Sequence, residues 1–277
     1  MYKIAVLGSE GYVGKAFANM ISSRYEVVRY DPSLGDKCAT KDEVNEAGLA
    51  VVCVPTLMSG DEFPHRCDTS IVEEVVSWLE TPVILIKSTV EPGTTDRLKK
   101  KYNKRICMSP EFIGEGKYFI PQEIDFSKRM EVTPFWVVGG DTRDVNYIYD
   151  LLVPILGPCK QYLKMTALDA ELNKYFENYF LGLKVIFSNE MREICDAFGA
   201  DYYAVREGWL ADPRVGRFHS INFKGREGFS GKCLPKDLNA LYRACMDKGY
   251  KPTLLRAVLE TNNKIRKNHN LQIDYEV

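Results

Sequence analysis

Short apolar runs alternate with amphipathic segments along the first part of the chain. Several runs have the length and composition of buried parallel strands. They are Lys3–Leu7, Glu26–Tyr30, Leu49–Val54, Val83–Ile86, Arg105–Met108 and Phe135–Val138. The helical pattern between them is clearest at Thr69–Leu79 and Asp144–Ile155. Strands that alternate with helices predict a Rossmann-like, doubly wound parallel sheet of the α/β class, with ligands at the carboxyl ends of the strands.

The longest helical pattern covers residues 166–199, where the start resembles a capping box and Gly199 suits the end. A helix of this length spans about 48 Å. Its apolar face is broader than a helix docked on one neighbour needs. We therefore expect it to pack against a second subunit too, so that the chain forms a homodimer. On this helix Lys174 and Asn178 are four residues apart and share a face, with plain solvent exposure as the alternative.

The alternating pattern stops near residues 162–166, and only helical periodicity follows. Two shorter helices are expected at 236–248 and 253–267. The chain is therefore predicted to have a Rossmann-like domain over residues 1–164 and an all-helical central and dimerisation domain over residues 165–277.

The composition is that of an ordinary soluble globular protein. The 277 residues carry a formal net charge of -1, which gives no reason to expect nucleic acid or an anionic membrane as a partner. No apolar run approaches the roughly 20 residues that span a bilayer, and the chain opens directly on a strand pattern, so we expect no signal peptide. The 8 cysteines show neither C-x-x-C nor His-paired spacing. We expect a cytoplasmic protein without a metal.

Gly8, Gly11 and Gly14 follow the first strand and open a helix, and Asp31 ends the second strand. This is the dinucleotide-binding arrangement, in which the pyrophosphate rests on the helix N-terminus and the acid binds the ribose hydroxyls. An acid there repels a 2′-phosphate, so we expect NAD. The loop is one residue longer than G-x-G-x-x-G, and a carboxylate at Glu10 would oppose the pyrophosphate unless it turned away. A purely structural turn is the alternative.

Polar residues also follow other predicted strands. Thr56, Ser88, Thr89 and Glu111 all fall at carboxyl ends, where a doubly wound sheet binds its ligand. The alternative for each is a polar side chain that satisfies its own turn.

The segment Gly228–Asp237 joins a glycine-rich loop to a cysteine and a helix start. Pro235 suits a first helical turn, which places Cys233 just ahead of a helix N-terminus. There the unpaired N–H groups and the helix dipole favour a thiolate, and Lys236 adds positive charge. Cys233 is therefore a candidate nucleophile, and a small buried cysteine behind a glycine turn is the alternative.

These motifs, taken in order, resemble those of the UDP-glucose/GDP-mannose dehydrogenase family. Any one of them is short, and their joint presence through nearly the whole chain carries the resemblance. The matching segments are 11–14, 54–56, 87–95, 109–112, 115–116, 171–174 with Asn178, 212–216 and 228–237.

The resemblance implies NAD-dependent oxidation of the primary alcohol of a nucleotide sugar to a carboxylate in two hydride transfers. Cys233 adds to the first-formed aldehyde, and the thiohemiacetal is oxidised to a thioester that water hydrolyses. Lys174 stabilises the developing oxyanion, with Asn178 beside it. The residues that position or activate the water are Asp237, Thr89 and Glu111.

The resemblance also implies the ligand contacts. Glu115 lies between the sugar and the nicotinamide, Arg214 reaches the substrate across the dimer, and Gly228 and Gly231 border the substrate. The implied cofactor contacts are Gly8, Gly11, Tyr12, Val13, Asp31, Val54, Pro55, Thr56, Ser88 and Lys236.

Departures from the family pattern limit the substrate assignment. The family usually has a further C-terminal nucleotide-binding domain, whereas this sequence stops at Val277, so we expect a short form. Lys232 stands before the cysteine where an uncharged residue is usual, Gly114 replaces a bulkier residue, and the segment between Arg214 and Cys233 is longer. Two rival functions stay open: a two-electron hydroxyacid dehydrogenase, which needs the lysine but not the cysteine, and a catalytically inactive NAD-binding subunit.

Overall fold

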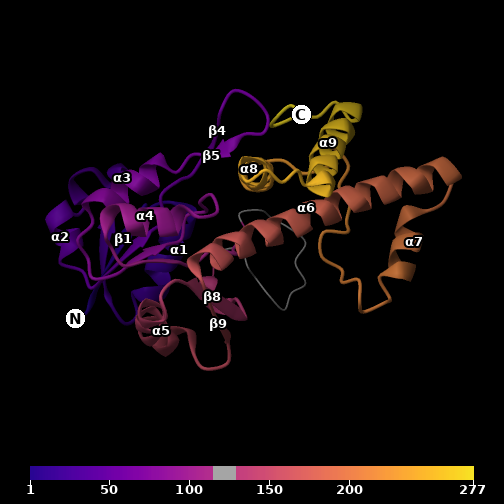
Figure 1. Ribbon diagram of the computed structural model, residues 1–277. Helices are drawn as coiled ribbons and strands as arrows, with labels where there is room; N and C mark the ends of the chain where they lie inside the picture. Colours follow the sequence, from indigo (N-terminus) through magenta and orange to yellow (C-terminus); the bar gives the residue numbers. More distant parts are fainter. Residues whose placement is uncertain (115–128) are drawn as a thin grey trace. The chain divides into compact units, whose positions relative to one another are not determined.

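The computed structural model describes residues 1–114 and 129–277, which form two compact units (Figure 1). Met1–Leu57 and Asp68–Lys174 make up the sheet unit. Met58–Cys67 and Tyr175–Val277 make up the helical unit.

The sheet unit is built on seven strands in the order β2-β1-β3-β6-β7-β8-β9. The strands are β1 (Lys3–Leu7), β2 (Glu26–Tyr30), β3 (Leu49–Val52), β6 (Ile84–Ile86), β7 (Ile106–Met108), β8 (Phe135–Gly139) and β9 (Gln161–Met165). The strands from β2 to β7 pair in parallel, which confirms the predicted doubly wound sheet. Because the order reverses between β1 and β3, the crevice at their carboxyl ends is the switch point where such sheets bind ligands.

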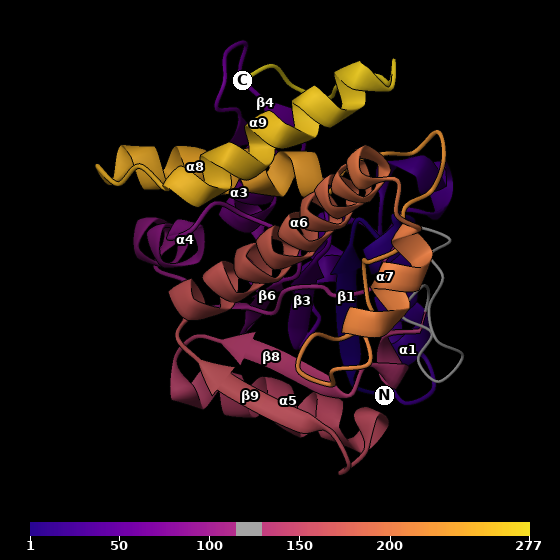
Figure 2. The same ribbon diagram turned by 90° about the vertical axis from the view of Figure 1, so that its right-hand side faces the viewer.

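The far edge of the sheet departs from the parallel pattern. β8 runs antiparallel to β7, and β9 lies beside β8 and parallel to it, with α5 (Thr142–Leu156) packed against β8 (Figure 2). The sequence pattern did not predict β9, whose residues are largely exposed.

Helices cover both faces of the sheet. One face packs against α1 (Tyr12–Ile21) and α5, and the other against α2 (Lys41–Asn45), α3 (Ser70–Trp78) and α4 (Thr94–Tyr102). Short 3-10 segments are η1 (Pro32–Lys37), which is kinked at Gly35, and η2 (Met130–Val132). Successive strand side chains enter opposite cores, as Ile4 and Val6 do on one face and Ala5 and Leu7 on the other.

The helical unit contains most of α6 (Ala167–Phe198), together with α7 (Tyr202–Trp209), α8 (Leu234–Asp247) and α9 (Thr253–Asn268). The predicted long helix is confirmed, and it passes from the sheet unit into the helical unit between Lys174 and Tyr175.

A hairpin that lies between β3 and α3 in the sequence also belongs to the helical unit. It consists of β4 (Met58–Ser59) and β5 (Arg66–Cys67), and β5 packs against α8. Phe63 at its tip stacks on Tyr242 of α8, with ring centroids 5.5 Å apart. Arg66 donates a hydrogen bond of 2.6 Å to Asp247 at the C-terminal end of α8.

Two glycine-to-alanine substitutions should act in opposite directions. A Cβ on Gly14 would lie 2.0 Å from the Gly8 carbonyl oxygen, so Gly14→Ala forces the backbone apart and should lower the free energy of unfolding by about 1–3 kcal/mol. A Cβ on the exposed helical Gly208 meets nothing within 4 Å, so Gly208→Ala should raise it by about 0.5–1 kcal/mol. Chemical denaturation of both variants and the wild type measures this, and equal effects would contradict the close packing of the loop.

Candidate active site

The loop after β1 is packed so closely that neither Gly8 nor Gly14 has room for a side chain. Gly8 adopts φ +76°, and a Cβ on it would lie 2.7 Å from the Cys53 carbonyl oxygen at the end of β3. Gly11 donates its N–H to the Gly8 carbonyl oxygen and caps α1, whose first turn holds no acid. The N-terminus of α1 therefore directs its positive dipole to the switch point, which suits a pyrophosphate.

The additional residue of this loop, Glu10, has its charge neutralised locally. Its carboxylate lies 3.2 Å from the Arg29 guanidinium on β2 and 3.6 Å from the Lys15 ammonium on α1. A carboxylate that is paired in this way does not stand unopposed against a bound pyrophosphate. The longer loop is thus compatible with a dinucleotide.

Asp31 lies at the end of β2, as predicted. Its carboxylate accepts hydrogen bonds from the Glu10 N–H (3.0 Å) and from the Ser33 N–H and hydroxyl (3.0 and 2.7 Å). Partial burial acts to raise the pKa of Asp31, but the hydrogen bonds from Ser33 and Glu10 outweigh it and lower that pKa. An ionised acceptor at this place suits ribose hydroxyl donors and disfavours a 2′-phosphate, so the residues present fit NAD.

The turns after β3 and β6 are joined by a serine. The Ser88 hydroxyl donates to the Val54 carbonyl oxygen at 2.6 Å, so this side chain satisfies a neighbouring turn. Pro55 is exposed, and Thr56 and Thr89 are half-buried.

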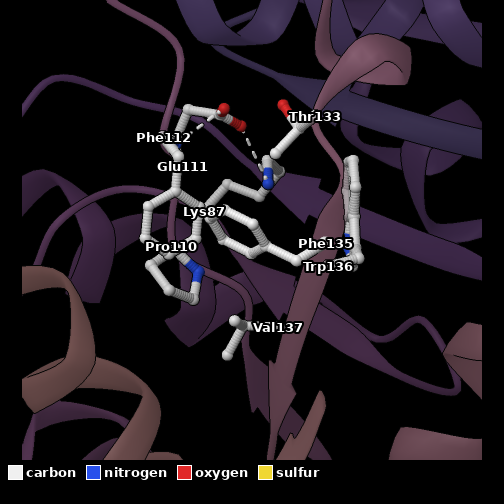
Figure 3. A pocket seen from close by; sticks show the side chains of 8 residues that line it. All are labelled: Lys87, Pro110, Glu111, Phe112, Thr133, Phe135, Trp136 and Val137. Atoms are coloured by element: carbon white, nitrogen blue, oxygen red, sulfur yellow. Dashed lines mark hydrogen bonds and ion pairs between the residues drawn. The ribbon is translucent and has the colours of Figure 1, made fainter. Parts of the chain in front are cut away.

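A buried ion pair lies at the carboxyl ends of β6 and β7. The ammonium of Lys87, whose side chain is only 1% exposed, lies 3.0 Å from Glu111 Oε2 and 4.7 Å from the centroid of the Trp136 ring. The other carboxylate oxygen accepts the N–H groups of Phe112 and Ile113 at 2.8 and 2.9 Å. Figure 3 shows the Lys87 and Glu111 side chains pointing toward each other in a small pocket. Glu111 is therefore held in one orientation.

Lys174 belongs to the same neighbourhood of the sheet unit. Its ammonium lies 5.1 Å from the centroid of the Phe112 ring, and Phe112 packs edge-on against Phe135. Phe112 directly follows Glu111 in the sequence. The structure thus brings Lys174 next to the segment that carries Glu111.

Cys233 caps α8, and its side chain is exposed. The loop before it turns at Gly228 (φ +72°) and Gly231 (φ +93°), and Pro235 lies in the first turn of the helix, as the sequence pattern predicted. The expected location ahead of a helix N-terminus is therefore confirmed, and the alternative of a buried cysteine is wrong.

Two charged residues of the first turn of α8 are buried and paired. Lys236 Nζ lies 2.7 Å from Asp237 Oδ1 and 3.7 Å from the sulfur of Cys67 on β5. The amide of Asn178 on α6 donates to Asp237 Oδ2 at 2.5 Å. Burial acts to lower the pKa of Lys236, but the adjacent Asp237 carboxylate outweighs it and raises that pKa. Asn178, Lys236 and Asp237 therefore form one buried network around the helical turn that follows Cys233.

The predicted site residues divide between the two units. Those of the sheet unit are Gly8, Gly11, Tyr12, Val13, Asp31, Val54, Pro55, Thr56, Ser88, Thr89, Glu111 and Lys174. Those of the helical unit are Asn178, Arg214, Gly228, Gly231, Cys233, Lys236 and Asp237. Arg214 is on an exposed loop and pairs with Asp212 of the same loop, and Glu115 lies outside the described residues.

Sequence reasoning missed the residues that hold the Cys233 loop. Asn262 of α9, 1% exposed, accepts the Phe229 N–H at 2.8 Å and donates to the Phe229 carbonyl at 3.1 Å. Arg266, which is 7% exposed, donates to the Glu227 carbonyl at 3.1 Å. Both residues continue the buried face begun by Leu255 and Leu259, a helical spacing that could have marked them.

No helix in the described parts of the chain is long and apolar enough to cross a membrane. Among the same residues, no group of three or more His, Cys, Asp or Glu side chains is arranged to hold a metal ion.

Thiol alkylation should separate the exposed cysteines from the buried ones. Burial raises the pKa of Cys53 and of Cys107 to about 12, so at pH 8 only about one in ten thousand of these thiols is ionised. Iodoacetamide should label Cys233 and the exposed Cys159 in the native protein, and Cys53 and Cys107 only in denaturant. Cys233 should react faster than Cys159 because it lies at a helix N-terminus, and peptide mass spectrometry measures both rates. A slower Cys233 would contradict an activated thiol.

Two family models match the chain. Residues 28–130 match the NAD binding domain of the UDP-glucose/GDP-mannose dehydrogenase family, and residues 168–264 match its central domain. The first match begins after the glycine loop, so that loop and the family model support a dinucleotide site independently. NAD is accordingly the cofactor, as predicted.

Known relatives agree with the family models. The UDP-glucose 6-dehydrogenase of Pseudomonas aeruginosa is 32% identical over 206 residues, which cover 70% of this chain and 43% of that protein. The putative UDP-glucose 6-dehydrogenase YtcA of Bacillus subtilis is 28% identical, with 94% of this chain and 67% of that protein covered. The chain thus spans less than half to about two thirds of these relatives.

A solved structure matches along nearly the whole chain. The UDP-glucose dehydrogenase of Pyrobaculum islandicum has a TM-score of 0.80 and 25% identity, and the match covers 96% of this chain and 69% of that one. The family models, the relatives and this fold agree with the motifs quoted from the sequence. This chain therefore belongs to the UDP-glucose/GDP-mannose dehydrogenase family.

Proposed function

We propose that this chain oxidises the primary alcohol of a nucleotide sugar to a carboxylate, with NAD as the hydride acceptor. The observation that carries the proposal is the exposed Cys233 at the N-terminus of α8, whose first turn holds the buried Lys236 and Asp237 in a network with Asn178. The relatives named UDP-glucose 6-dehydrogenase support UDP-glucose as the first substrate to test.

The bound cofactor supplies the hydride acceptor for each of the two oxidations. The Cys233 thiolate adds to the carbon of the aldehyde formed in the first, and the oxygen becomes that of a thiohemiacetal. Loss of hydride from the same carbon leaves a thioester, and water adds to the thioester carbonyl and expels the thiolate. The products are the carboxylic acid and the regenerated thiol. Covalent capture keeps the reactive aldehyde on the protein between the two oxidations.

Lys174 stabilises the oxyanion of these steps. Its ammonium lies over the Phe112 ring, and this cation–π contact restricts the position of an otherwise flexible side chain. The Asn178 amide, which is oriented by its hydrogen bond to Asp237, stands one helical turn further along α6.

Two carboxylates and a hydroxyl orient the hydrolytic water. Asp237 is 2% exposed, and both of its oxygens have a partner, Lys236 on one side and Asn178 on the other. Glu111 is held by Lys87 and by two backbone N–H groups. Such fixed carboxylates suit the orientation of a water molecule, and Thr89 supplies a further hydroxyl at the end of β6.

The other expected contacts are part of this proposal. Glu115, which is outside the described residues, is expected to contact the sugar and the nicotinamide, Arg214 is expected to reach the substrate of the second subunit, and Gly228 and Gly231 are expected to border the sugar. The cytoplasmic location stays a prediction, as does the expected lack of nucleic-acid and membrane partners.

The rival functions differ in which residues they need. A two-electron hydroxyacid dehydrogenase would use Lys174 and Asn178 and would leave Cys233 without a role. An inactive NAD-binding subunit would need no paired Lys236 and Asp237 in the helical turn after an exposed thiol. The joint presence of these residues therefore favours the four-electron oxidation.

The stoichiometry of NADH separates the proposed reaction from its rivals. We expect the purified chain to form two NADH per UDP-glucose. GDP-mannose and other nucleotide sugars should be tested as alternative substrates in the same assay. Cys233→Ser should lower acid formation by about 1,000-fold or more, and Lys174→Met should lower kcat by about 100- to 1,000-fold. Cys159→Ser, which removes the other exposed thiol, is the control. Full turnover to acid in Cys233→Ser would exclude the covalent mechanism.

A homodimer through α6 is also proposed. Phe176 and Phe180 are 57% and 58% exposed on one face of this helix, and Phe187 continues that face at 45%. Monomeric proteins rarely expose such a stripe of aromatic side chains. A second copy of the same helix is the partner that the proposal assigns.

Disruption of this face should produce a monomer. Burial of each phenylalanine contributes about 1.5–3 kcal/mol, so the Phe176→Ser, Phe180→Ser double variant should raise the dimer dissociation constant by at least about 100-fold. Sedimentation equilibrium measures the constant, and Asp196→Asn, at an exposed position on the opposite side of the same helix, is the matched control. A dimer of unchanged affinity would place the interface elsewhere.

A further inference from the structure

We propose that Glu171 is a positioning residue, which fixes the start of α6, and with it Lys174, to the N-terminus of α4. The proposal rests on the proposed function for the role of Lys174. In the described parts of the chain Glu171 is hydrogen-bonded to Gly93 and Thr95 of the α4 N-terminus, so its effect on the reaction is expected to act through Lys174.

The first turn of α4 receives its cap from a different helix. α4 begins after Gly93, which has φ +92° and no side chain to accept a hydrogen bond. Glu171 Oε2 accepts the Gly93 N–H at 2.5 Å, and Oε1 accepts the Thr95 N–H at 2.8 Å and the Thr95 hydroxyl at 2.6 Å. The N–H groups that a helix start leaves unpaired are thus satisfied by α6.

The electrostatics of this contact favour one geometry. Glu171 is 1% exposed, so its carboxylate would be costly to bury without partners. Burial raises the pKa of Glu171, and the hydrogen bonds from Thr95 and Gly93 oppose that rise. The helix dipole of α4 adds a favourable term for negative charge at its N-terminus. A carboxylate with three donors around it leaves α6 little freedom to rotate or slide.

The same part of α6 is packed tightly on the sheet. A Cβ on Gly139 of β8 would lie 2.3 Å from the Thr166 carbonyl oxygen and 2.6 Å from the Ala170 Cβ. The helix start is therefore pressed against β8 from one side and anchored to α4 by Glu171 from another.

Lys174 is the next residue on the face that Glu171 begins. The two residues are three positions apart on one helix, so their side chains are neighbours. α4 packs against β7, and the segment after β7 carries Phe112, whose ring lies under the Lys174 ammonium. The anchor thus ties the helix that bears Lys174 to the layer of the sheet unit that bears its aromatic partner.

Two substitutions test the anchor at different strengths. Glu171→Gln keeps the shape of the side chain but presents an NH2 group where a carboxylate oxygen accepted an N–H, and it removes the charge. Thr95→Val removes only the hydroxyl donor and keeps the backbone contact. Glu190→Gln, an exposed glutamate on the same helix, is the matched control.

The first measurement is kinetic, with UDP-glucose and NAD as the probes. Glu171→Gln should lower kcat by about 10- to 100-fold, since a small misplacement of a catalytic group has effects of this size, while the dissociation constant of NAD changes less than about twofold. The kcat of Thr95→Val should lie between the kcat of Glu171→Gln and that of the control. In a Lys174→Met background Glu171→Gln should have no further effect on kcat, because Glu171 acts through Lys174.

The second measurement does not depend on activity. Amide hydrogen exchange of Gly93 and Thr95 should become about five- to tenfold faster in Glu171→Gln, while exchange in α9 is unchanged. Unchanged exchange at both amides, or a kcat loss of equal size with and without Lys174, would overturn the positioning role. If the wild type forms no NADH from any nucleotide sugar, the proposed function fails, and the exchange rates alone then decide whether Glu171 anchors α6.

Discussion

Charged side chains that are buried must be compensated where they lie, and the candidate site depends on this constraint. Lys87 pairs with Glu111 where β6 and β7 end, and Lys236 pairs with Asp237 where α8 begins. Either charge of a pair would be costly without the other, so each pair holds both of its members in a single arrangement. Glu111 and Asp237 are thereby oriented by contacts within their own units.

A single helix connects these two pairs. Lys174 belongs to the sheet unit and Asn178 to the helical unit, although they are one turn apart on α6. The cofactor-binding loop, the Lys87–Glu111 pair and Lys174 form one group, and Cys233 with its buried network forms the other. In the proposed reaction, the first group supplies most of the dinucleotide contacts together with Lys174 and Glu111, and the second supplies Cys233, Asn178, Lys236 and Asp237. An intact α6 is thus a requirement for the reaction as proposed.

The sequence pattern was sufficient for most of the fold and insufficient at one edge of the sheet. β1, β3, β6 and β7 are buried on both faces, so each appears as a continuous apolar run. β9 is an edge strand with mainly exposed residues, and it therefore lacks the apolar run on which the prediction relied. The antiparallel direction of β8 was not predicted either, because the residues of a strand do not indicate whether it runs parallel or antiparallel to its neighbour. Cys233 and Asp31 could be singled out because each stands next to the start or end of an element, whereas the role of Lys174, which lies inside α6, came from the family resemblance.

The residues missed by sequence reasoning share a different property. Glu171, Asn262 and Arg266 are buried polar side chains that bind backbone groups of distant segments. A helical period shows that such a position is buried, but it does not identify the N–H or carbonyl group that makes burial tolerable. Glu10 illustrates the converse: it looked unfavourable beside a pyrophosphate, and its partner Arg29 lies on the neighbouring strand. A residue that departs from a family motif therefore has to be judged with the partners that the fold supplies, because the charge that the bound ligand meets is that of the whole group.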